Sequence, residues 1–599
     1  MVRLISSLAL FLCLIGGAIA AQPSSDEIYP LDLLKPGQRG EVWTVFRGTE
    51  PEPFTVEVTG VVRNALGPGK SLILCQLTDA RVQAMGAVAG MSGSPLYVEG
   101  KLAGALSYQI QRFETVHYAG FTPAADLVEV RTKMATAWQR DNNATMPVSG
   151  KSGTGATPPA AHSEPSTLSA ESLRPMRPVF TLSGLSPAVA DLFAARFSAL
   201  GLSATSLGGS LDSSADAAKL PVQPLTPGSA VAVALATGDI TLAGTGTVSN
   251  IDGKSVTAFG HPMMSLGDVA LPMCAAEIVT ILPSNMQSVK VANTGRVIGT
   301  ITQDRLSAVS GMLGEGPAMT EVEVVVNTRG HAPKTLHFSV ARQEQLTPVL
   351  VATGVSQAIL GSNDAGLSNG FLLKSDVMFP TKPTLASRTL YAGPQGFQQG
   401  LNQFVQDLAQ SLQNPYEKTF PRKVVFTVEA LDQNPAVTLE LFQLSRSTAR
   451  AGEVVQATIS WRDYQGESHR QTFDIPVDPA WTGRTLDVVL APGHVLDELT
   501  GRSRTIEASQ LRSFDAYLAA MQDERPADGL CIAVVERASL FTDQSSATPD
   551  APSSIERIAR TADEARFNQV DAVVPLWERH VLEGKLSSAS VRRALKVVD

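Results

Sequence analysis

The stretch Gly90-Met91-Ser92-Gly93-Ser94-Pro95 decides how the N-terminal part of this chain is expected to fold. It leads into two short apolar segments, residues 96–98 and 102–106, on either side of the turn Glu99-Gly100-Lys101, which is the pattern of a β-hairpin. Glycine adopts backbone conformations that are closed to other residues, so the two glycines allow the chain to turn sharply before and after Ser92. The stretch therefore predicts a tight turn that presents Ser92 beside a strand.

A serine in such a turn is a candidate nucleophile. Its hydroxyl reacts well only when a base takes its proton and when preorganised donors stabilise the oxyanion. The backbone amides of Gly90 and Ser92 could point together at a substrate carbonyl oxygen and form an oxyanion hole. Small-residue turns between strands are common, so the same stretch is also compatible with a purely structural hairpin.

His261 is the candidate base. It stands in Ala258-Phe259-Gly260-His261-Pro262, after the strand-like run 244–248 and the turn Asp252-Gly253. A histidine placed after a strand can act as a general base, although a histidine that only holds a turn by hydrogen bonds would look the same. His117 is a rival because it is close to Ser92 in the sequence.

An acidic residue would orient the imidazole and stabilise its charged form. Asp79, at the end of an apolar strand in Leu77-Thr78-Asp79, is the first choice, although such a residue is often only a helix or turn cap. Asp268 and Asp304 compete for this role. A Ser/Lys hydrolase, with Lys101 or Lys254 as the base, is a further alternative.

Taken together, these segments resemble the SpoIVB (sporulation protein IVB) family of serine peptidases, whose members carry a Gly-Met-Ser-Gly-Ser-Pro nucleophile motif and a trypsin-like fold. Besides that motif and its hairpin, the resemblance covers Leu34–Gly37, Val45-Phe46, Phe54–Val58, Leu77–Asp79, Ala119–Pro123, Gly244–Val248, Phe259–His261, Val297–Ile301 and Gln303–Arg305. It implies that Ser92 is the nucleophile, His261 the base and Asp79 the acidic third member.

The order of these segments departs from the family. In the sporulation peptidase the histidine segment precedes the other two, whereas here Asp79 and Ser92 come first, as if the chain were circularly permuted. Catalytic triads of one geometry do occur with different chain orders. The PDZ module of the sporulation peptidase is not found, and the region after about residue 345 has no counterpart in it.

The resemblance implies a serine endopeptidase that cleaves envelope or exported proteins and needs neither a metal nor another cofactor. The alternative is a noncatalytic envelope binding or assembly protein on a peptidase-derived fold. With a net charge of -9 and no basic stretch interleaved with aromatic residues, nucleic acid is not an expected partner. The expected partner is a protein or peptide substrate, together with the cell envelope; the sequence does not indicate an oligomeric state.

Residues 1–20 have the pattern of a secretory signal peptide. Arg3 precedes the apolar run 8–15, and Ala18-Ile19-Ala20 supplies the small residues of a cleavage site after Ala20. The alternative is a retained anchor, but the apolar run is shorter than the roughly 20 residues that span a bilayer. The mature protein is expected to be periplasmic or extracellular. Its three cysteines, Cys75, Cys274 and Cys531, imply no disulfide framework and are expected to be buried thiols.

The fold class expected for the whole chain is mainly β, with two barrels of the trypsin-like kind formed by two separated segments. The expected order is a signal peptide (1–20), a barrel with Asp79 and Ser92 (28–132), a flexible linker (133–175), a barrel with His261 (176–345), a mixed connecting region (346–420), an immunoglobulin-like β-sandwich (421–500) and a mixed helical tail (501–599). Helices are expected over 187–200, 398–412, 505–522 and 590–597.

Overall fold

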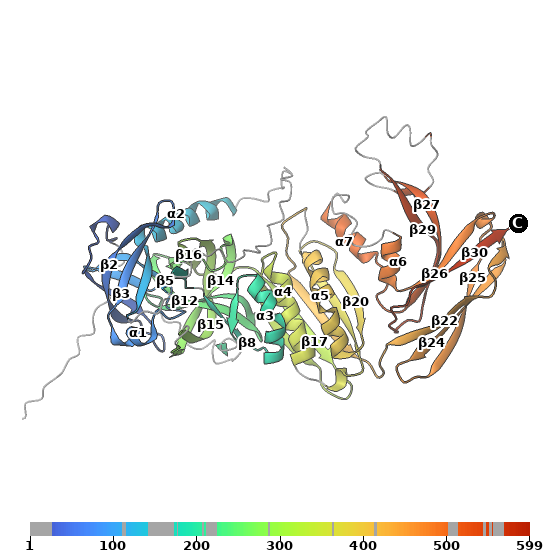
Figure 1. The fold of residues 1–599 in the computed structure, drawn as a ribbon, viewed down its shortest axis with the longest axis horizontal. Coiled ribbons are helices and arrows are strands. Elements are labelled where there is room, and N and C mark those ends of the chain that lie inside the picture. The colour runs from blue at the N-terminus through green and yellow to red at the C-terminus, as the bar shows by residue number, and fades with distance from the viewer. Residues whose placement is uncertain are drawn as a thin grey trace, which may run out of the picture.

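The computed structural model describes most of the chain after its N-terminus. The described residues are 27–110, 116–141, 173–176, 178–205, 209–210, 224–284, 288–361, 365–412, 416–500, 513–542, 547–549, 554 and 568–599. The expected signal peptide and residues 142–172 of the expected linker lie outside them. Within the described part, the mainly β architecture predicted from the sequence is confirmed, and Figure 1 shows it as a row of sheets with helices against them.

The first unit is a closed barrel of six strands, drawn in blue in Figure 1. The strands run in the order β4-β1-β2-β3-β6-β5, and β4 pairs with β5 to close the ring. Phe54, Val56 and Val58 of β2 are buried while Thr55 and Glu57 are exposed, because successive side chains of a strand point to opposite faces. The bounds are β1 Arg39–Thr44, β2 Glu52–Gly67, β3 Lys70–Leu77, β4 Pro95–Val98, β5 Lys101–Ile110 and β6 Tyr118–Pro123.

A second ring of six strands lies within a larger mixed sheet. Its order is β11-β14-β15-β16-β13-β12, and β11 also pairs with β12, so these strands close on themselves. The first ten residues of β12 are all buried, and they are mostly small. The bounds are β11 Ala230–Gly238, β12 Thr241–Asp252, β13 Ser255–Ala258, β14 Gly267–Leu282, β15 Val289–Arg305 and β16 Ala308–Leu313.

The same sheet continues beyond the second ring on both sides. From β11 it runs on in the order β18-β17-β21-β19-β20, and from β12 it runs to β8 and β9. The bounds are β8 Val179–Ser183, β9 Ser203–Thr205, β17 Met319–Asn327, β18 Lys334–Ala341, β19 Phe371–Met378, β20 Leu385–Tyr391 and β21 Lys423–Ala430. Residues 423–430, which the sequence assigns to the sandwich, are therefore part of this sheet, paired with β17 and β19.

Helices pack against this extended sheet. They are α3 (Pro187–Ala199), α4 (Leu346–Ser356) and α5 (Gly393–Leu412), and their buried side chains join one apolar core with the strands. Phe397, Leu401 and Leu408 of α5 lie on one face, as the 3.6-residue period requires. The predicted helices at 187–200 and 398–412 are confirmed.

The C-terminal region, residues 437–599, contains two further sheets that share one apolar core. The first has the order β22-β24-β25, and the second has β23-β30-β26-β27-β28 with β29 also on β27. The bounds are β22 Val437–Leu444, β23 Thr448–Arg450, β24 Val454–Asp463, β25 Ser468–Pro476, β26 Thr485–Ala491, β27 Leu530–Thr542, β28 Ala547–Pro549, β29 Asn568–Val581 and β30 Val591–Val598. The second sheet thus takes strands from the segment that the sequence assigns to a helical tail.

The helix predicted over 590–597 is wrong, because these residues form β30. Their helix-forming side chains are overruled by pairing with β26, which buries Leu595 and Val597 at a spacing of two. Helix α6 covers Gly493–Leu499, and α7 covers Phe514–Gln522, the end of the helix predicted over 505–522. None of the helices in the described ranges combines the length and the apolar character needed to cross a bilayer.

Two elements complete the N-terminal half. Helix α1 (Ala80–Met85) leads to the nucleophile stretch, and α2 (Ala124–Asp141) extends into the start of the predicted linker. The far end of that linker contains strand β7, Leu173–Pro175, which joins the edge of the first barrel at β5. The three cysteines are buried thiols, as expected, and burial raises the pKa of Cys531 to about 11.

Candidate active site

The serine stretch forms a tight turn between α1 and β4. Gly90 and Gly93 both have positive φ, 97° and 95°, which is the left-handed region that glycine enters without strain. The turn is closed by backbone hydrogen bonds: Met91 N donates to Val88 O, and Ser94 N donates to Met91 O. The predicted turn is therefore present, and both glycines are needed for its shape.

This turn is fastened to both rings. On the side of its own barrel, Gly93 N donates to Leu106 O at 2.7 Å. On the other side, its carbonyl groups accept hydrogen bonds from β12: Thr247 N donates to Ser92 O at 2.8 Å, and Thr247 Oγ1 donates to Gly90 O at 3.0 Å. The turn thus lies at the junction of the two rings.

Ser92 differs from its neighbour Ser94 in its hydrogen bonding. Both side chains are fully buried. Ser94 Oγ donates to Met91 O at 2.6 Å, whereas Ser92 Oγ has no partner within the described residues. Buried hydroxyls are normally hydrogen-bonded, so the Ser92 hydroxyl keeps a hydrogen-bonding capacity that the described residues do not use.

The imidazole comes from the loop that follows β13. Phe259 and Gly260 both have φ of 68°, which turns the chain sharply before His261. Thr122 of the first barrel donates through Oγ1 to the Gly260 carbonyl at 2.7 Å. The Phe259 ring lies edge-on to the imidazole, with 6.2 Å between ring centroids.

His261 is buried and holds one defined tautomer. Its Nδ1 lies 2.7 Å from the carbonyl oxygen of Pro262, and because a carbonyl can only accept, Nδ1 carries the proton. Nε2 is then a bare acceptor, and it has no partner in the described part of the chain. Burial lowers the pKa of His261 to about 4, since the charged imidazolium cannot be solvated there. The side chain is thus a neutral base at ordinary pH.

The segments of Ser92 and His261 meet at Gly93. A Cβ atom on Gly93 would lie 2.0 Å from the Thr247 carbonyl oxygen and 2.4 Å from Phe259 N, so no side chain fits between them. Segments far apart in the sequence are thereby brought into contact. Ser92 Oγ and His261 Nε2 nevertheless make no hydrogen bond with each other.

Gly90 and Ser92, the predicted oxyanion-hole residues, lie in the same turn. Within the described residues, the amides of Gly90 and Ser92 donate to no other protein group. Two unpaired amides in one glycine turn are what an oxyanion site requires. Their presence agrees with the predicted role without testing it.

Asp79 is not placed beside His261. It is the N-cap of α1, where its carboxylate accepts from Arg81 N at 2.8 Å and forms an ion pair with the Arg81 guanidinium at 3.1 Å. The hydrogen bonds from Arg81 lower the pKa of Asp79. In this structure Asp79 has the capping role and the Pro262 carbonyl occupies Nδ1 of His261, so the role of Asp79 as the orienting acid stays a prediction.

Of the two competing acids, Asp304 is attached to the histidine loop. Its carboxylate is buried and accepts from the backbone amides of Met263, Met264 and Leu266, at 2.7, 2.8 and 3.2 Å. Asp304 thus fixes the backbone immediately after His261 without touching the imidazole. Asp268 instead pairs with Arg305 at 2.6 Å.

Lys290 is a buried residue near the turn that the sequence did not reveal. Its Nζ donates to Thr44 Oγ1 at 2.8 Å, and its stem lies against Gly90, whose Cβ would come within 3.0 Å of Lys290 Cβ. Burial lowers the pKa of Lys290 to about 7. Nothing distinguished this residue in the sequence, since a lysine in a strand is usually exposed.

The remaining alternatives lie elsewhere. His117 lies against Gly86 at the end of α1. Lys101 is exposed and pairs with Glu27, and Lys254 is exposed in the β12–β13 turn. Neither lysine has the buried setting that would lower the pKa of an amine and make it a base.

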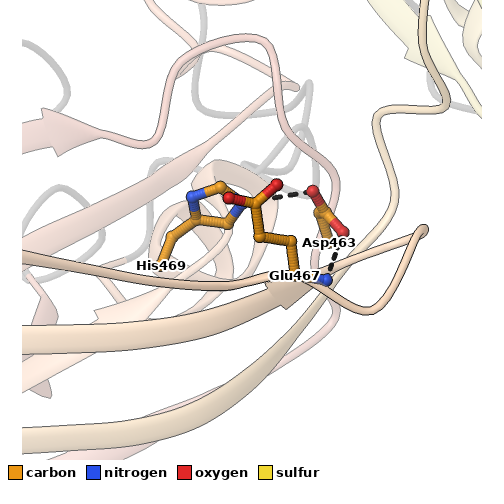
Figure 2. A group of neighbouring side chains, drawn as sticks. All are labelled: Asp463, Glu467 and His469. Atoms are coloured by element: carbon orange, nitrogen blue, oxygen red, sulfur yellow. Dashed lines mark hydrogen bonds and ion pairs between the residues drawn. The ribbon is translucent and has the colours of Figure 1, made fainter.

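One group of side chains has the composition of a metal site. Asp463, Glu467 and His469 converge on the β24–β25 hairpin, with potential ligand atoms within 4.8 Å of one another (Figure 2). Asp463 Oδ2 lies 3.1 Å from His469 Nε2, and Asp463 Oδ1 accepts from the amides of Gln465 and Glu467. Turn capping and one ion pair account for this arrangement, and the predicted absence of a metal cofactor stays a prediction.

Comparison with known proteins finds a similarity in the N-terminal part. The family model described as SpoIVB peptidase S55 matches residues 24–121, which include α1, the serine turn and five complete strands of the first barrel. No curated protein and no solved structure matches the chain. The matched segment contains Ser92 but ends well before His261.

Proposed function

Since residues 24–121 belong to the SpoIVB peptidase S55 family, a family of serine peptidases, we propose that this chain is an exported serine endopeptidase that hydrolyses peptide bonds of envelope or exported proteins. Ser92 is the nucleophile and His261 is the base. The observation that carries the assignment is the contact at Gly93, which packs the Ser92 turn on the Phe259–His261 loop while Ser92 Oγ and His261 Nε2 both remain without a partner.

The proposed fold is a trypsin-like pair of barrels in permuted order. Two rings of six strands support it, each closed by one additional strand pairing. The nucleophile belongs to the first ring and the imidazole to the second, so the reacting groups lie where the two rings meet. Triads on unrelated folds likewise keep their geometry while the chain order changes.

The chemistry follows from these positions. Ser92 Oγ attacks the carbonyl carbon of the scissile peptide bond while its proton passes to His261 Nε2, and the amides of Gly90 and Ser92 receive the negative oxygen. His261 then gives the proton to the leaving amine, and an acyl-enzyme remains. Water then reacts in the same way: it loses a proton to His261 and attacks the ester of the acyl-enzyme. The carboxylic acid is released, and Ser92 regains its proton from His261. The net consumption is one water per peptide bond.

The imidazole in this proposal is oriented by a carbonyl group and not by a carboxylate. Pro262 O holds the proton on Nδ1, and Asp304 holds the loop through three amides. A carbonyl fixes the tautomer as a carboxylate would, but it supplies no full charge to stabilise the imidazolium. A dyad of this kind is expected to be slower than a triad.

One observation is also compatible with the noncatalytic alternative. Both Ser92 and His261 are fully buried and make no hydrogen bond with each other, so the site is closed in this structure. A closed site fits either an enzyme that must open or an envelope scaffold that has lost the reaction. The two are separated by whether Ser92 reacts.

A fluorophosphonate probe, which reacts covalently with activated serines, tests the proposal. The intact protein should be labelled, and Ser92→Ala should abolish labelling. Ser94→Ala is the matched control, because Ser94 is equally buried in the same turn but has a hydrogen-bonded hydroxyl, and it should retain labelling. Equal labelling of all three proteins would remove Ser92 from the mechanism.

Export is part of the same proposal and is tested separately. The mature protein should begin after Ala20, and Edman sequencing of the purified native protein reads that end directly. Replacing Ala20 by Lys should block processing while leaving the probe reaction of the folded part unchanged. A mature protein that keeps Met1 would contradict cleavage.

A further inference from the structure

Strand β7 pairs with the end of β5, on an edge of the first barrel that no other strand of the described residues covers. Leu173–Pro175 pairs antiparallel with the end of β5, with Ile110 opposite Leu173, Gln109 opposite Arg174 and Tyr108 opposite Pro175. Met176 N then donates to Ser107 O at 2.9 Å. Four consecutive residues therefore lie along β5 as an added strand.

This edge of β5 leads directly to the nucleophile. Pro95 of β4 is opposite Ala105, and the next residue, Leu106, exchanges hydrogen bonds with the serine turn: Gly93 N donates to Leu106 O at 2.7 Å, and Leu106 N donates to Ser94 O at 2.9 Å. The residue after that, Ser107, accepts a hydrogen bond from Met176 N. The added strand thus pairs with β5 directly after the residue that the serine turn contacts.

Met176 fills an apolar site beside the turn. It is 2% exposed and packs in the cluster of the first barrel that also contains Met91 and Leu106. Met91 directly precedes Ser92. The segment is consequently held by main-chain hydrogen bonds and by one buried side chain in the apolar core that also contains Met91.

After Met176 the chain crosses to the other ring. Phe180, in β8, is fully buried and lies opposite Gly244 of β12. Met176 is thus bonded to β5 of the first ring, and Phe180, four residues later, is paired with β12 of the second ring. This part of the chain is anchored to both rings.

Strand addition to a free sheet edge, with pockets for alternate side chains, is a general mode of peptide recognition. On this basis we propose that Leu173–Met176 is a resident pseudosubstrate, a segment of the chain that occupies the place of a peptide on β5 and keeps the site closed. The peptides that compete with it are extended and carry a flexible apolar side chain in the position of Met176. The inference rests on the proposed function, because it takes β5 to be the edge on which substrate lies.

The tethered segment has a large advantage over a free peptide. Attachment by a short linker corresponds to an effective concentration in the millimolar range. A peptide that binds the empty edge with a Kd of tens of micromolar would therefore compete poorly with the resident strand. We expect the wild-type protein to be labelled slowly and peptide binding to appear only when the segment is displaced.

The first test measures binding without catalysis. Full-length protein with Ser92→Ala is combined with Met176→Asp, which places a carboxylate in the apolar site, and is titrated with a fluorescein-labelled peptide of residues 172–178 (Ser-Leu-Arg-Pro-Met-Arg-Pro). The peptide should bind at least about tenfold more tightly than to Ser92→Ala alone. The same peptide with Asp for Met is the control and should not bind.

The second test measures access to Ser92. With Ser92 intact, Met176→Asp should raise the rate of fluorophosphonate labelling about tenfold or more, while Met176→Leu, which conserves volume, should leave it within about twofold. If Met176→Asp fails to fold, the combination of Leu173→Gly, Arg174→Ser, Pro175→Gly and Met176→Ser removes the strand without burying a charge.

The outcomes separate the two proposals. Peptide binding and faster labelling support the pseudosubstrate. Peptide binding without labelling in any variant supports β5 as an edge that binds an added strand and contradicts the proposed hydrolysis. Labelling that is as fast in the wild type as in folded displaced variants, or absence of peptide binding to those variants, overturns the pseudosubstrate and leaves the proposed hydrolase intact.

Discussion

Buried polar groups are treated differently at the junction of the two rings and in the C-terminal region. In the C-terminal region the Arg525 guanidinium, 4% exposed, is held by Asp497 at 2.5 Å and by Glu578 at 2.7 Å. At the junction, Ser92 Oγ and His261 Nε2 have no partner among the described residues. An unmade buried hydrogen bond costs about 1–3 kcal/mol. The contrast teaches that the buried charges of Arg525 and Asp497 are satisfied within the fold, whereas the hydroxyl and the imidazole at the junction have the free hydrogen-bonding capacity that the proposed chemistry requires.

Removing the imidazole should have the largest effect at the junction. His261→Gln is expected to lower the rate of fluorophosphonate labelling by about 100- to 10,000-fold, because it removes the base to which the proposal assigns the Ser92 proton. His331→Gln, at an exposed histidine, is the control and should leave the rate unchanged. A rate within twofold of the wild type in His261→Gln would contradict the assigned base.

Breaking the buried ion pairs of Arg525 should lower the free energy of unfolding and leave the rate of fluorophosphonate labelling unchanged. Asp497→Ala removes one partner of the buried Arg525 and is expected to lower the free energy of unfolding of the C-terminal region by about 3–5 kcal/mol. Urea unfolding measures this loss.

The matched control is Asp432→Ala, which breaks the exposed pair with Arg329 and should cost less than about 1 kcal/mol. Both variants should be labelled at the wild-type rate under conditions in which they are folded. Loss of labelling in folded Asp497→Ala would show that the two regions are not separate in function.

The pH dependence of stability should reveal the buried imidazole. Its pKa is about 4 when folded and about 6.5 when unfolded, so between these values the unfolded chain binds a proton that the folded chain does not. Stability should therefore fall as the pH falls from 6.5 toward 4, by about 2 kcal/mol at pH 5. Urea unfolding at pH 7 and pH 5 measures this, and His261→Gln should remove the corresponding part of the loss.

Replacing Asp304 and replacing Asp79 should change the rate of fluorophosphonate labelling to different extents, and the difference should be smaller than the effect of His261→Gln. Asp304→Asn weakens the hold on the loop after His261 and is expected to slow labelling by about tenfold, because small displacements of a catalytic group are costly. Asp79→Asn keeps an N-cap side chain and should leave the rate within about twofold. Equal loss in both variants would return Asp79 to the mechanism.

Much of the local structure could be predicted from the sequence. The alternation around Phe54–Val58 predicted the strand, and Gly90 and Gly93 predicted the turn. Both signals depend on nearby residues only. The helix predicted over 590–597 failed because partner strands distant in sequence determine that segment. The C-terminal sheets were divided incorrectly for the same reason.

The candidate site was predictable in its chemistry and less so in its contacts. Ser92 and His261 were found by their glycine and proline framing, and the structure packs their segments together. The sequence could not show that Arg81 binds the carboxylate of Asp79, because this ion pair depends on the geometry at the start of α1. Lys290 was missed because its burial is created by two strands and a turn that meet only in the fold.

The sequence by itself determined which residues turn, which strands alternate and which side chains can react, because these properties belong to a residue and its immediate neighbours. Only the tertiary structure decided that the serine turn and the histidine loop meet at Gly93, that the Asp304 carboxylate accepts from the amides of that loop, and that Met176 is buried in the core of the first barrel. These contacts join residues from separate strands, and their free energy depends on burial and hydrogen bonding that arise only when the rings close and pack.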